Sequence, residues 1–337
     1  MSNSAPDYIT PSVENLLSET EYRIYDTLLA VILSLCTLVG LPGNLLSLIY
    51  FYSANKRDSS LIYTMICGVD VCTCFFHLPV TIALYNTRRA GMFGDITFCV
   101  TWIVAFNYVQ LMSMFLVMLL SVSRTISLIF LHYKIKQQFL VVAYLTYSSL
   151  LIVWYIIAHV FGESEKWYGY DEFTVYCWRD LYAKPLSYID QLFRAISIGV
   201  PPVFTSISFT LVTEKLLRKS QVSSKNDKKH QAAVTMAMFT ALFLVCNLPC
   251  LFNNIMWFIT KLLYEYPGPI YSQPFMAYYS WLISDVVCTV LNAALNPILY
   301  LSRMNHFREW LSAKVSCRNL HRKLSSERST EQYTTSI

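Results

Sequence analysis

Two carboxylates lie inside long apolar stretches of the sequence, Asp70 within residues 60–86 and Asp285 within residues 275–302. An ionised carboxylate in an apolar environment is costly unless it is paired, so a membrane segment that keeps one usually uses it for binding or switching. Arg194 holds a comparable position near the start of residues 187–219. Arg194 and Asp285 are therefore a candidate ionisable pair, which either binds opposite ends of a ligand or forms an internal salt bridge.

Other side chains capable of chemistry form no catalytic or metal-binding pattern. The ten cysteines are scattered, mostly singly and within apolar runs, and the six histidines include no HExxH motif. Cys67, Cys72 and Cys74 share one apolar run without a matching histidine or acid cluster, which favours packing thiols over a metal site. The sequence also has no GxSxG motif and no phosphate-binding loop. We therefore predict a binding protein rather than an enzyme, with no nucleic-acid partner.

The elements that carry these residues are predicted to be membrane-spanning helices. Hydrophobic residues make up 55% of the 337 residues and charged residues 14%, whereas soluble domains carry about 25% charged residues. About 20 helical residues are needed to cross a hydrocarbon core of about 30 Å. Seven apolar runs are long enough, namely 26–53, 60–86, 96–130, 137–161, 187–219, 229–262 and 275–302. The sequence thus predicts an all-α membrane protein built as a seven-helix bundle.

The distribution of basic residues predicts how the bundle is oriented. With the N-terminus outside the cell, 18 of the 26 lysines and arginines fall on the inner side and 8 on the outer side. This asymmetry satisfies the positive-inside rule. We expect an extracellular segment over 1–25, the bundle over 26–302, a short amphipathic eighth helix over 303–316 and a cytoplasmic tail over 317–337, in a multi-pass protein of the plasma membrane.

Several motifs follow one another along these spans. They are Gly43-Asn44 in the first span, Asp70 nine residues before Pro79 in the second, Cys99 and, 25 residues later, Arg124 in the third, Cys246-Asn247-Leu248-Pro249 in the sixth and Asn296-Pro297-Ile298-Leu299-Tyr300 in the seventh. Together they resemble the rhodopsin-like (class A) G-protein-coupled receptors, as a divergent, peptide-receptor-like member with Asn247 in place of a tryptophan. The resemblance implies a receptor that binds an extracellular ligand and activates heterotrimeric G proteins by helix rearrangement.

The resemblance further implies an allosteric sodium ion beside Asp70. Matched by position, Ser113, Asn292 and Asn296 would surround this carboxylate. One carboxylate and several neutral oxygen atoms suit a hard monovalent cation. In the resembled receptors this ion favours the inactive state. A water-bridged polar network without an ion is the alternative, and no other cofactor is expected.

A set of activation switches is also implied by the resemblance. These residues are Arg124, Phe243, Asn247, Pro249, Asn296, Pro297 and Tyr300. Phe243 would belong, with Met114 and Pro201, to the connector between the ligand pocket and the G-protein site. Packing alone is the other interpretation of these apolar side chains.

Arg124 departs from the family pattern on both sides. Ser123 precedes it where the family has an acid, and Thr125 follows it where the family has tyrosine. Lys229 stands where some members supply a second acid. We expect raised basal activity, because less free energy would hold the third and sixth spans together.

Matched by position, the ligand pocket comprises Phe106, Asn107, Gln110, Arg194, Asn247, Asn254 and Asp285. Phe106 replaces the aspartate of amine receptors and Val290 replaces the retinal-bearing lysine of opsins, so neither ligand is expected. The segment between the fourth and fifth spans is acidic and aromatic, which would concentrate a cationic ligand. A peptide is the favoured ligand, with a small polar metabolite or a lipid as the alternative.

Other expectations concern the loops and the tail. Cys99 and Cys177 are the candidates for an extracellular disulfide, and the alternation in residues 174–178 suggests a short hairpin. Cys317 is a candidate for palmitoylation or a free thiol. The Ser- and Thr-rich tail suits a receptor kinase and arrestin, and its end, Thr335-Ser336-Ile337, fits a PDZ-domain ligand. The eighth helix would contact membrane lipids.

Two rival functions remain open at this point. A receptor-shaped scaffold that does not signal is consistent with the altered surroundings of Arg124. A transporter is disfavoured, because the sequence shows no internal repeat and few charges within the spans.

Overall fold

The computed structural model describes residues 19–53, 60–85, 96–129, 135–161, 170–171, 174–175, 186–220, 228–263, 280 and 282–315. Within these residues the chain is helical apart from one short hairpin. The elements are α1 (Glu19–Ser53), α2 (Ser60–Phe76), α3 (Leu78–Tyr85), α4 (Ile96–Ile129), α5 (Gln137–Phe161), β1 (Tyr170–Asp171), β2 (Thr174–Val175), α6 (Leu186–Ser220), α7 (Lys228–Leu263), η3 (Leu282–Val287), α9 (Cys288–Arg303) and α10 (Asn305–Val315).

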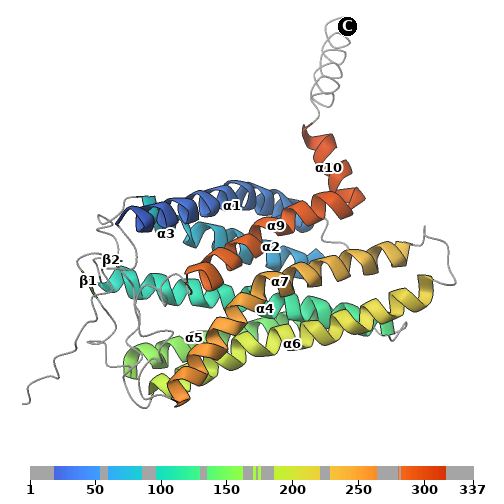
Figure 1. The fold of residues 1–337 in the computed structure, drawn as a ribbon. Coiled ribbons are helices and arrows are strands. Elements are labelled where there is room, and N and C mark those ends of the chain that lie inside the picture. The colour runs from blue at the N-terminus through green and yellow to red at the C-terminus, as the bar shows by residue number, and fades with distance from the viewer. Residues whose placement is uncertain are drawn as a thin grey trace, which may run out of the picture.

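Seven helical segments in the described part of the chain are long and apolar enough to cross a membrane. They are Ile24–Ser53, Leu61–Ile82, Val104–Ser127, Gln137–Ile157, Leu192–Lys215, Ala237–Met256 and Leu282–Arg303. The helices run alongside one another as a bundle, and α10 follows as a short eighth helix that turns away from it (Figure 1). The predicted fold class is confirmed.

The two ends of the bundle differ in what they carry (Figure 1). At one end β1 pairs with β2 in antiparallel register, with Tyr170 opposite Val175, as the alternation in the sequence suggested for this segment. At the other end lies α10. We refer to the two ends as the hairpin half and the α10 half.

The centre of the bundle is formed by α4 and by the last span, η3 with α9. In the apolar stretches of these two spans 67% of residues are buried, against 17% in α5 and 28% in α1. Large apolar side chains such as Leu38, Leu150 and Phe252 face outward instead. An apolar exterior around a partly polar interior is what a bilayer requires of a spanning bundle.

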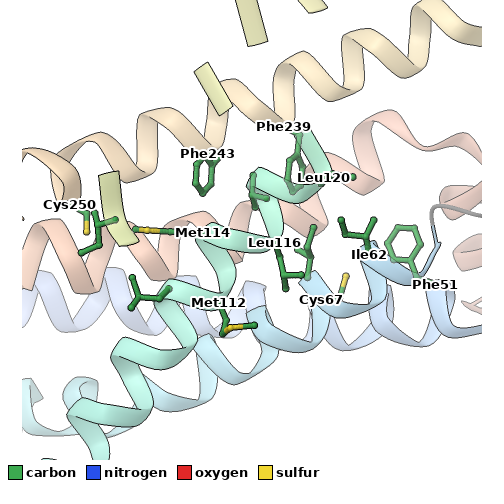
Figure 2. Packing of buried hydrophobic residues seen from close by; sticks show 14 of the residues in the cluster. Phe51, Ile62, Cys67, Met112, Met114, Leu116, Leu120, Phe239, Phe243 and Cys250 are labelled. Atoms are coloured by element: carbon green, nitrogen blue, oxygen red, sulfur yellow. The ribbon is translucent and has the colours of Figure 1, made fainter. Parts of the chain in front are cut away.

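Sulfur-containing, aliphatic and aromatic side chains interdigitate in the main core. Met114 and Leu120 of α4 lie opposite Phe243 and Phe239 of α7, and Phe51 closes one end of this layer (Figure 2). Each of these five residues is nearly fully buried. The core therefore fixes how α7 packs against α4.

Glycines allow α1 to approach the last span closely. A Cβ atom on Gly40 would lie 2.8 Å from Cys74 Sγ and 3.0 Å from Ala294 Cα, and one on Gly43 would lie 2.7 Å from Pro297 Cβ. Small residues commonly permit such close packing between membrane helices. The Gly43-Asn44 pair thus places Asn44 directly against the last span.

The second span, predicted over 60–86, is interrupted at one residue within the described part of the chain. α2 ends at Phe76, and α3 begins at Leu78. Pro79 has no N–H group to continue the helical ladder. Trp102 Nε1 donates a hydrogen bond to Phe76 O at 2.7 Å, and both the backbone and the hydroxyl group of Thr81 donate to His77 O, at 3.0 and 3.1 Å. Side chains thus compensate for the broken ladder.

The seventh span departs from a regular helix as well. Its described part begins with the π-helical turn η3 over Leu282–Val287 and continues as α9. A π-helical turn is rare and occurs frequently at functional sites. Asp285 lies in this turn.

Candidate functional site

A buried hydrogen bond joins the second and seventh spans near the middle of the bundle. Asn296 Nδ2 donates to Asp70 Oδ2 at 2.7 Å, and both residues are almost completely buried. The hydroxyl of Ser113 lies close enough to this carboxylate to favour its charged form. Asp70 Oδ1 is buried and has no hydrogen-bond partner among the described residues. A carboxylate that is only half satisfied in an apolar interior is a candidate binding group.

Three of the four residues expected around a sodium ion thus come together. Asn292, the fourth, is buried one helical turn before Asn296 and has no described bond to Asp70. The unpaired Oδ1 atom, a hydroxyl and amide oxygens are the donor types that fit a hard monovalent cation. No cluster of three or more His, Cys, Asp or Glu residues suited to a metal ion occurs in the described part of the chain.

The first span is joined to the same region through a backbone carbonyl. Asn44 Nδ2 donates to Ala293 O at 2.9 Å. Ala293 precedes Pro297 by four residues, so its carbonyl would accept the N–H group that proline lacks. The Asn44 side chain therefore supplies the donor that the helix cannot supply, and it ties α1 to the turn before Pro297.

A cluster of aromatic rings surrounds Tyr300 in the α10 half. The ring of Tyr300 lies 5.2 Å from that of Phe51, 5.9 Å from Tyr63 and 6.3 Å from Phe239, measured between centroids. Phe307 of α10 packs on Tyr50 at 5.0 Å. Tyr300 is fully buried, so its position depends on rings contributed by four other helical segments.

Arg124 lies on α4 in the same half of the bundle, and the residues around it differ from the family pattern. The Ser123 hydroxyl donates to Leu120 O at 2.9 Å, which is a bond within α4. No ion pair to Arg124 occurs among the described residues, and the side chain of Lys229 lies outside them. A polar contact that does connect α4 with α7 in this half is the long hydrogen bond of 3.5 Å between Ser121 and Thr240.

The proposed connector residues occupy the core between the two halves. Phe243 and Met114 are buried in the same cluster (Figure 2), and Pro201 is buried within α6. Asn247 Nδ2 donates to Phe243 O of its own helix at 2.8 Å. Pro249 is exposed on the outer face of α7. These positions are compatible both with a switch and with packing.

Most of the predicted pocket residues form a polar network in the hairpin half. Gln110 Nε2 donates to Thr289 Oγ1 at 3.0 Å and lies 3.5 Å from Asp285 O. Asn254 Nδ2 lies 3.5 Å from Asp285 Oδ1. One turn earlier on α4, Asn107 Oδ1 accepts a hydrogen bond from Arg194 at 2.9 Å. Spans three, five, six and seven are thus connected by side chains.

Several further residues of this half were not predicted from the sequence. Thr289, Ser284 and Cys250 contact the predicted residues. His77 is fully buried at the break of the second span, with Nδ1 on Thr73 O and its ring 5.0 Å from that of Phe106. An imidazole within an apolar run is the signal in the sequence that marks His77.

Phe106 faces this histidine and Trp102 rather than the Gln110 network. The rings of Phe106 and Trp102 stack at 5.5 Å with an interplanar angle of 9°. The predicted pocket residues therefore fall into three groups, around Phe106, around Asn107 with Arg194, and around Gln110 with Asp285. Asn247 belongs to none of these by hydrogen bonding.

Some predicted residues lie outside the part of the chain that is described. Cys177, Cys317 and the tail belong to this group, and so does the side chain of Cys99. The disulfide, the palmitoylation site and the PDZ ligand remain predictions. The cysteines of the described spans, including Cys67, Cys72 and Cys74, are free thiols.

Comparison with solved structures identifies the architecture. The chain matches the crystal structure of squid rhodopsin with a TM-score of 0.64 at 15% sequence identity, over 86% of this chain and 85% of that one. The chain has the rhodopsin fold. No sequence-family profile and no curated protein sequence matches it. At this identity the likeness concerns the fold, and the function has to be argued from the residues.

Proposed function

We propose that this chain is a G-protein-coupled receptor of the plasma membrane, with the hairpin half outside and the α10 half toward the cytoplasm. The observation that carries the proposal is the buried Asp70–Asn296 hydrogen bond within a rhodopsin fold. It joins two spans through groups that can exchange partners, and it lies beside Pro297, which has no backbone N–H to donate within α9.

The proposed mechanism begins in the polar network of the hairpin half. A ligand that displaces Gln110 or Asp285 from the contacts between them would move the last span, because Gln110 bonds both ends of the junction between η3 and α9. Movement of α9 would disturb the Asp70–Asn296 bond and then the rings around Tyr300. The α10 half would open and present Arg124 to a heterotrimeric G protein.

A sodium ion would act on the same spans. Asp70, Ser113, Asn292 and Asn296 are the residues that would hold it, and the ion would supply positive charge that neutralises the buried carboxylate. Sodium chloride is expected to raise the unfolding temperature of the purified chain above that in choline chloride of equal concentration. Asp70→Ala should remove the difference, and a difference that persists in this variant would favour the water-bridged network.

The remaining partners are proposed from the sequence alone. A peptide is the favoured extracellular ligand, because the segment between α5 and α6 is acidic and aromatic. The tail after residue 317 would recruit a receptor kinase, arrestin and a PDZ-domain protein. A small polar metabolite or a lipid is the second candidate ligand.

Mutation of Arg124 tests the receptor proposal directly. The chain is expressed with promiscuous G proteins, and the basal signal is measured together with the amount of protein at the cell surface. Arg124→Ala is expected to reduce the signal to that of cells without the chain, and Ser123→Asp to lower it by giving the arginine a partner. Arg308→Ala, which removes an exposed arginine of α10, is the matched control and should leave the signal unchanged.

Two outcomes contradict the proposal. A basal signal that persists in Arg124→Ala at equal surface expression would show that another group transmits it. A chain that reaches the surface and signals neither alone nor with any peptide or metabolite of a screening library would instead be a receptor-like scaffold.

A further inference from the structure

A narrow cleft lies between α4, α6 and α7 in the α10 half of the bundle. Four of the residues that line it carry a hydroxyl group, Ser121 and Thr125 of α4, Ser208 of α6 and Thr240 of α7. The space between the walls amounts to about 170 Å³, part of it open to the surroundings, but it is nowhere wide enough for a water molecule. The structure thus shows this cleft in a closed form.

The four hydroxyl groups are buried and have hydrogen-bonding capacity to spare. Each of the four residues is at most 6% exposed. Ser121 and Thr240 are joined at 3.5 Å, whereas hydroxyl groups usually bond at about 2.7–2.8 Å. Thr125 donates to Ser121 O of its own helix, so its oxygen atom can still accept. Because buried polar groups are normally satisfied, these hydroxyl groups suit a ligand that both donates and accepts hydrogen bonds.

The rest of the cleft wall is apolar. It is formed by Phe209, Val212 and Ala237, and none of the described residues that line the cleft is ionisable. Phe209 and Ala237 are half-buried, so the cleft reaches the surface of the bundle beside them. A charged group would find no charged partner here and would be costly to bury, whereas a short alkyl chain would gain from burial. The lining therefore selects a neutral ligand with an apolar part.

The closed cleft has no room for such a ligand, so binding requires α7 to move away from α4. Across the cleft the two helices are connected by the long hydrogen bond between Ser121 and Thr240. A ligand could replace this bond with shorter ones to the same hydroxyl groups. A ligand that fits only the widened cleft shifts the equilibrium toward the widened form, because its affinity for the two forms differs.

We propose that the cleft between α4, α6 and α7 binds a small neutral alcohol, which hydrogen-bonds to Ser208 and Thr240 and places its alkyl part against Phe209 and Val212. The alcohol is either a soluble molecule or the free hydroxyl end of a neutral lipid. The site lies in the opposite half of the bundle from the predicted extracellular ligand pocket. Its occupation favours separation of α7 from α4, and only the resulting change in signalling rests on the proposed function.

Photolabelling of the full chain in lipid nanodiscs tests the site without any signal from a G protein. The probe is hexanol with a diazirine on its chain, and unlabelled hexanol is the competitor. Labelling that hexanol suppresses is expected on the segments around Phe209 and Ala237, which mass spectrometry identifies. Hexanoate and hexane, which keep the chain but carry a charge or lack the hydroxyl group, should compete much more weakly. Competition by dioleoylglycerol in the bilayer would assign the natural ligand to the lipids, and its absence would assign it to soluble alcohols.

Variants locate the hydroxyl groups that bind. Ser208→Ala and Thr240→Val are each expected to weaken the competition by hexanol about two- to tenfold, as the loss of one hydrogen bond implies. Ser206→Ala, which removes an exposed hydroxyl group of the same helix as Ser208, is the matched control and should change nothing. Ala237→Leu fills the cleft, so it should abolish the suppressible labelling and raise the basal signal.

Equal competition by hexane, or suppressible labelling confined to residues outside the cleft, would overturn the proposal. Undiminished competition in both Ser208→Ala and Thr240→Val, or wild-type labelling of Ala237→Leu, would overturn it as well. Suppressible labelling of the cleft in a chain that never signals would remove the receptor proposal and leave the alcohol site standing.

Discussion

The two halves of the bundle are held together by different kinds of contact. In the hairpin half, α4 is connected to α6 and to the last span by side-chain hydrogen bonds from Asn107 and Gln110. In the α10 half, aromatic rings around Tyr300 join five helical segments, and α4 meets α7 through one hydrogen bond of 3.5 Å among the described residues. Directional polar contacts dominate one half and ring packing dominates the other.

This difference indicates that the two halves serve different roles, ligand recognition in the hairpin half and helix movement in the α10 half. A hydrogen-bonded network has few alternative geometries, so it suits the recognition of one ligand. Aromatic rings bury large areas and pack favourably in both stacked and edge-to-face arrangements, and both occur around Tyr300. We infer that the helices of the α10 half can shift by small distances and still remain packed. The α10 half, which we propose opens toward a G protein, is thus the half with fewer side-chain hydrogen bonds between helices.

The largest expected effect comes from removing the central ring of the α10 half. Tyr300→Ala is expected to lower the free energy of unfolding by about 3–5 kcal/mol, because a buried aromatic side chain leaves a cavity when it is truncated. Equilibrium unfolding in mixed micelles measures this change. Tyr300→Phe keeps the ring and should lose far less, and Tyr52→Ala, at a residue that is 72% exposed, is the surface control. A loss no greater than that of Tyr52→Ala would break the comparison.

A smaller effect is expected in the hairpin half. Gln110→Leu removes the contacts to Thr289 and Asp285 O but keeps the volume of the side chain. Hydrogen bonds between membrane helices contribute on average about 0.6 kcal/mol, with a maximum near 1.7, so a loss of about 1 kcal/mol is expected in the same assay. A loss as large as that of Tyr300→Ala would show that polar contacts, rather than rings, dominate stability.

The smallest effect is expected at the polar contact between α4 and α7 in the α10 half. Ser121→Ala removes a hydrogen bond of 3.5 Å to Thr240. Because the bond is long, the change in the free energy of unfolding should stay below about 0.6 kcal/mol. The double variant with Thr240→Val isolates the coupling between the two residues. A coupling energy larger than the loss of unfolding free energy in Gln110→Leu would mean that the hydrogen bond between Ser121 and Thr240 restrains the α10 half.

The sequence was sufficient to predict the fold because the thickness of a bilayer sets the length of each apolar run. Seven apolar runs of suitable length determine seven spans, whatever their packing. The length of a span is recorded directly in the sequence. The approach of Asn296 to Asp70 was predicted in another way, from the resemblance of the motifs around both residues to those of the receptor family.

The breaks in the second and seventh spans could not be predicted in the same way. At the break near His77, Trp102 of α4 donates a hydrogen bond to a backbone carbonyl of α2. At the π-helical turn, Gln110 of α4 contacts the carbonyl of Asp285. Pro79 is a local signal for an interruption of the second span, but the side chains of α4 that contact both irregular turns cannot be identified from residues 60–86 or 275–302 alone. The division of the predicted pocket into three groups has the same origin, because it follows from the rotation of each helix about its axis.

The contact between Asn44 and Ala293 has a consequence for how the last span can bend. A proline within a helix leaves the carbonyl four residues earlier without its backbone donor. Here that carbonyl belongs to Ala293, and Asn44 of the first span supplies the donor. Any displacement of the α10 end of α9 must therefore either move α1 with it or leave the buried Ala293 carbonyl without its donor. We therefore expect bending of α9 at Pro297 to depend on how far the Asn44 side chain can follow the Ala293 carbonyl.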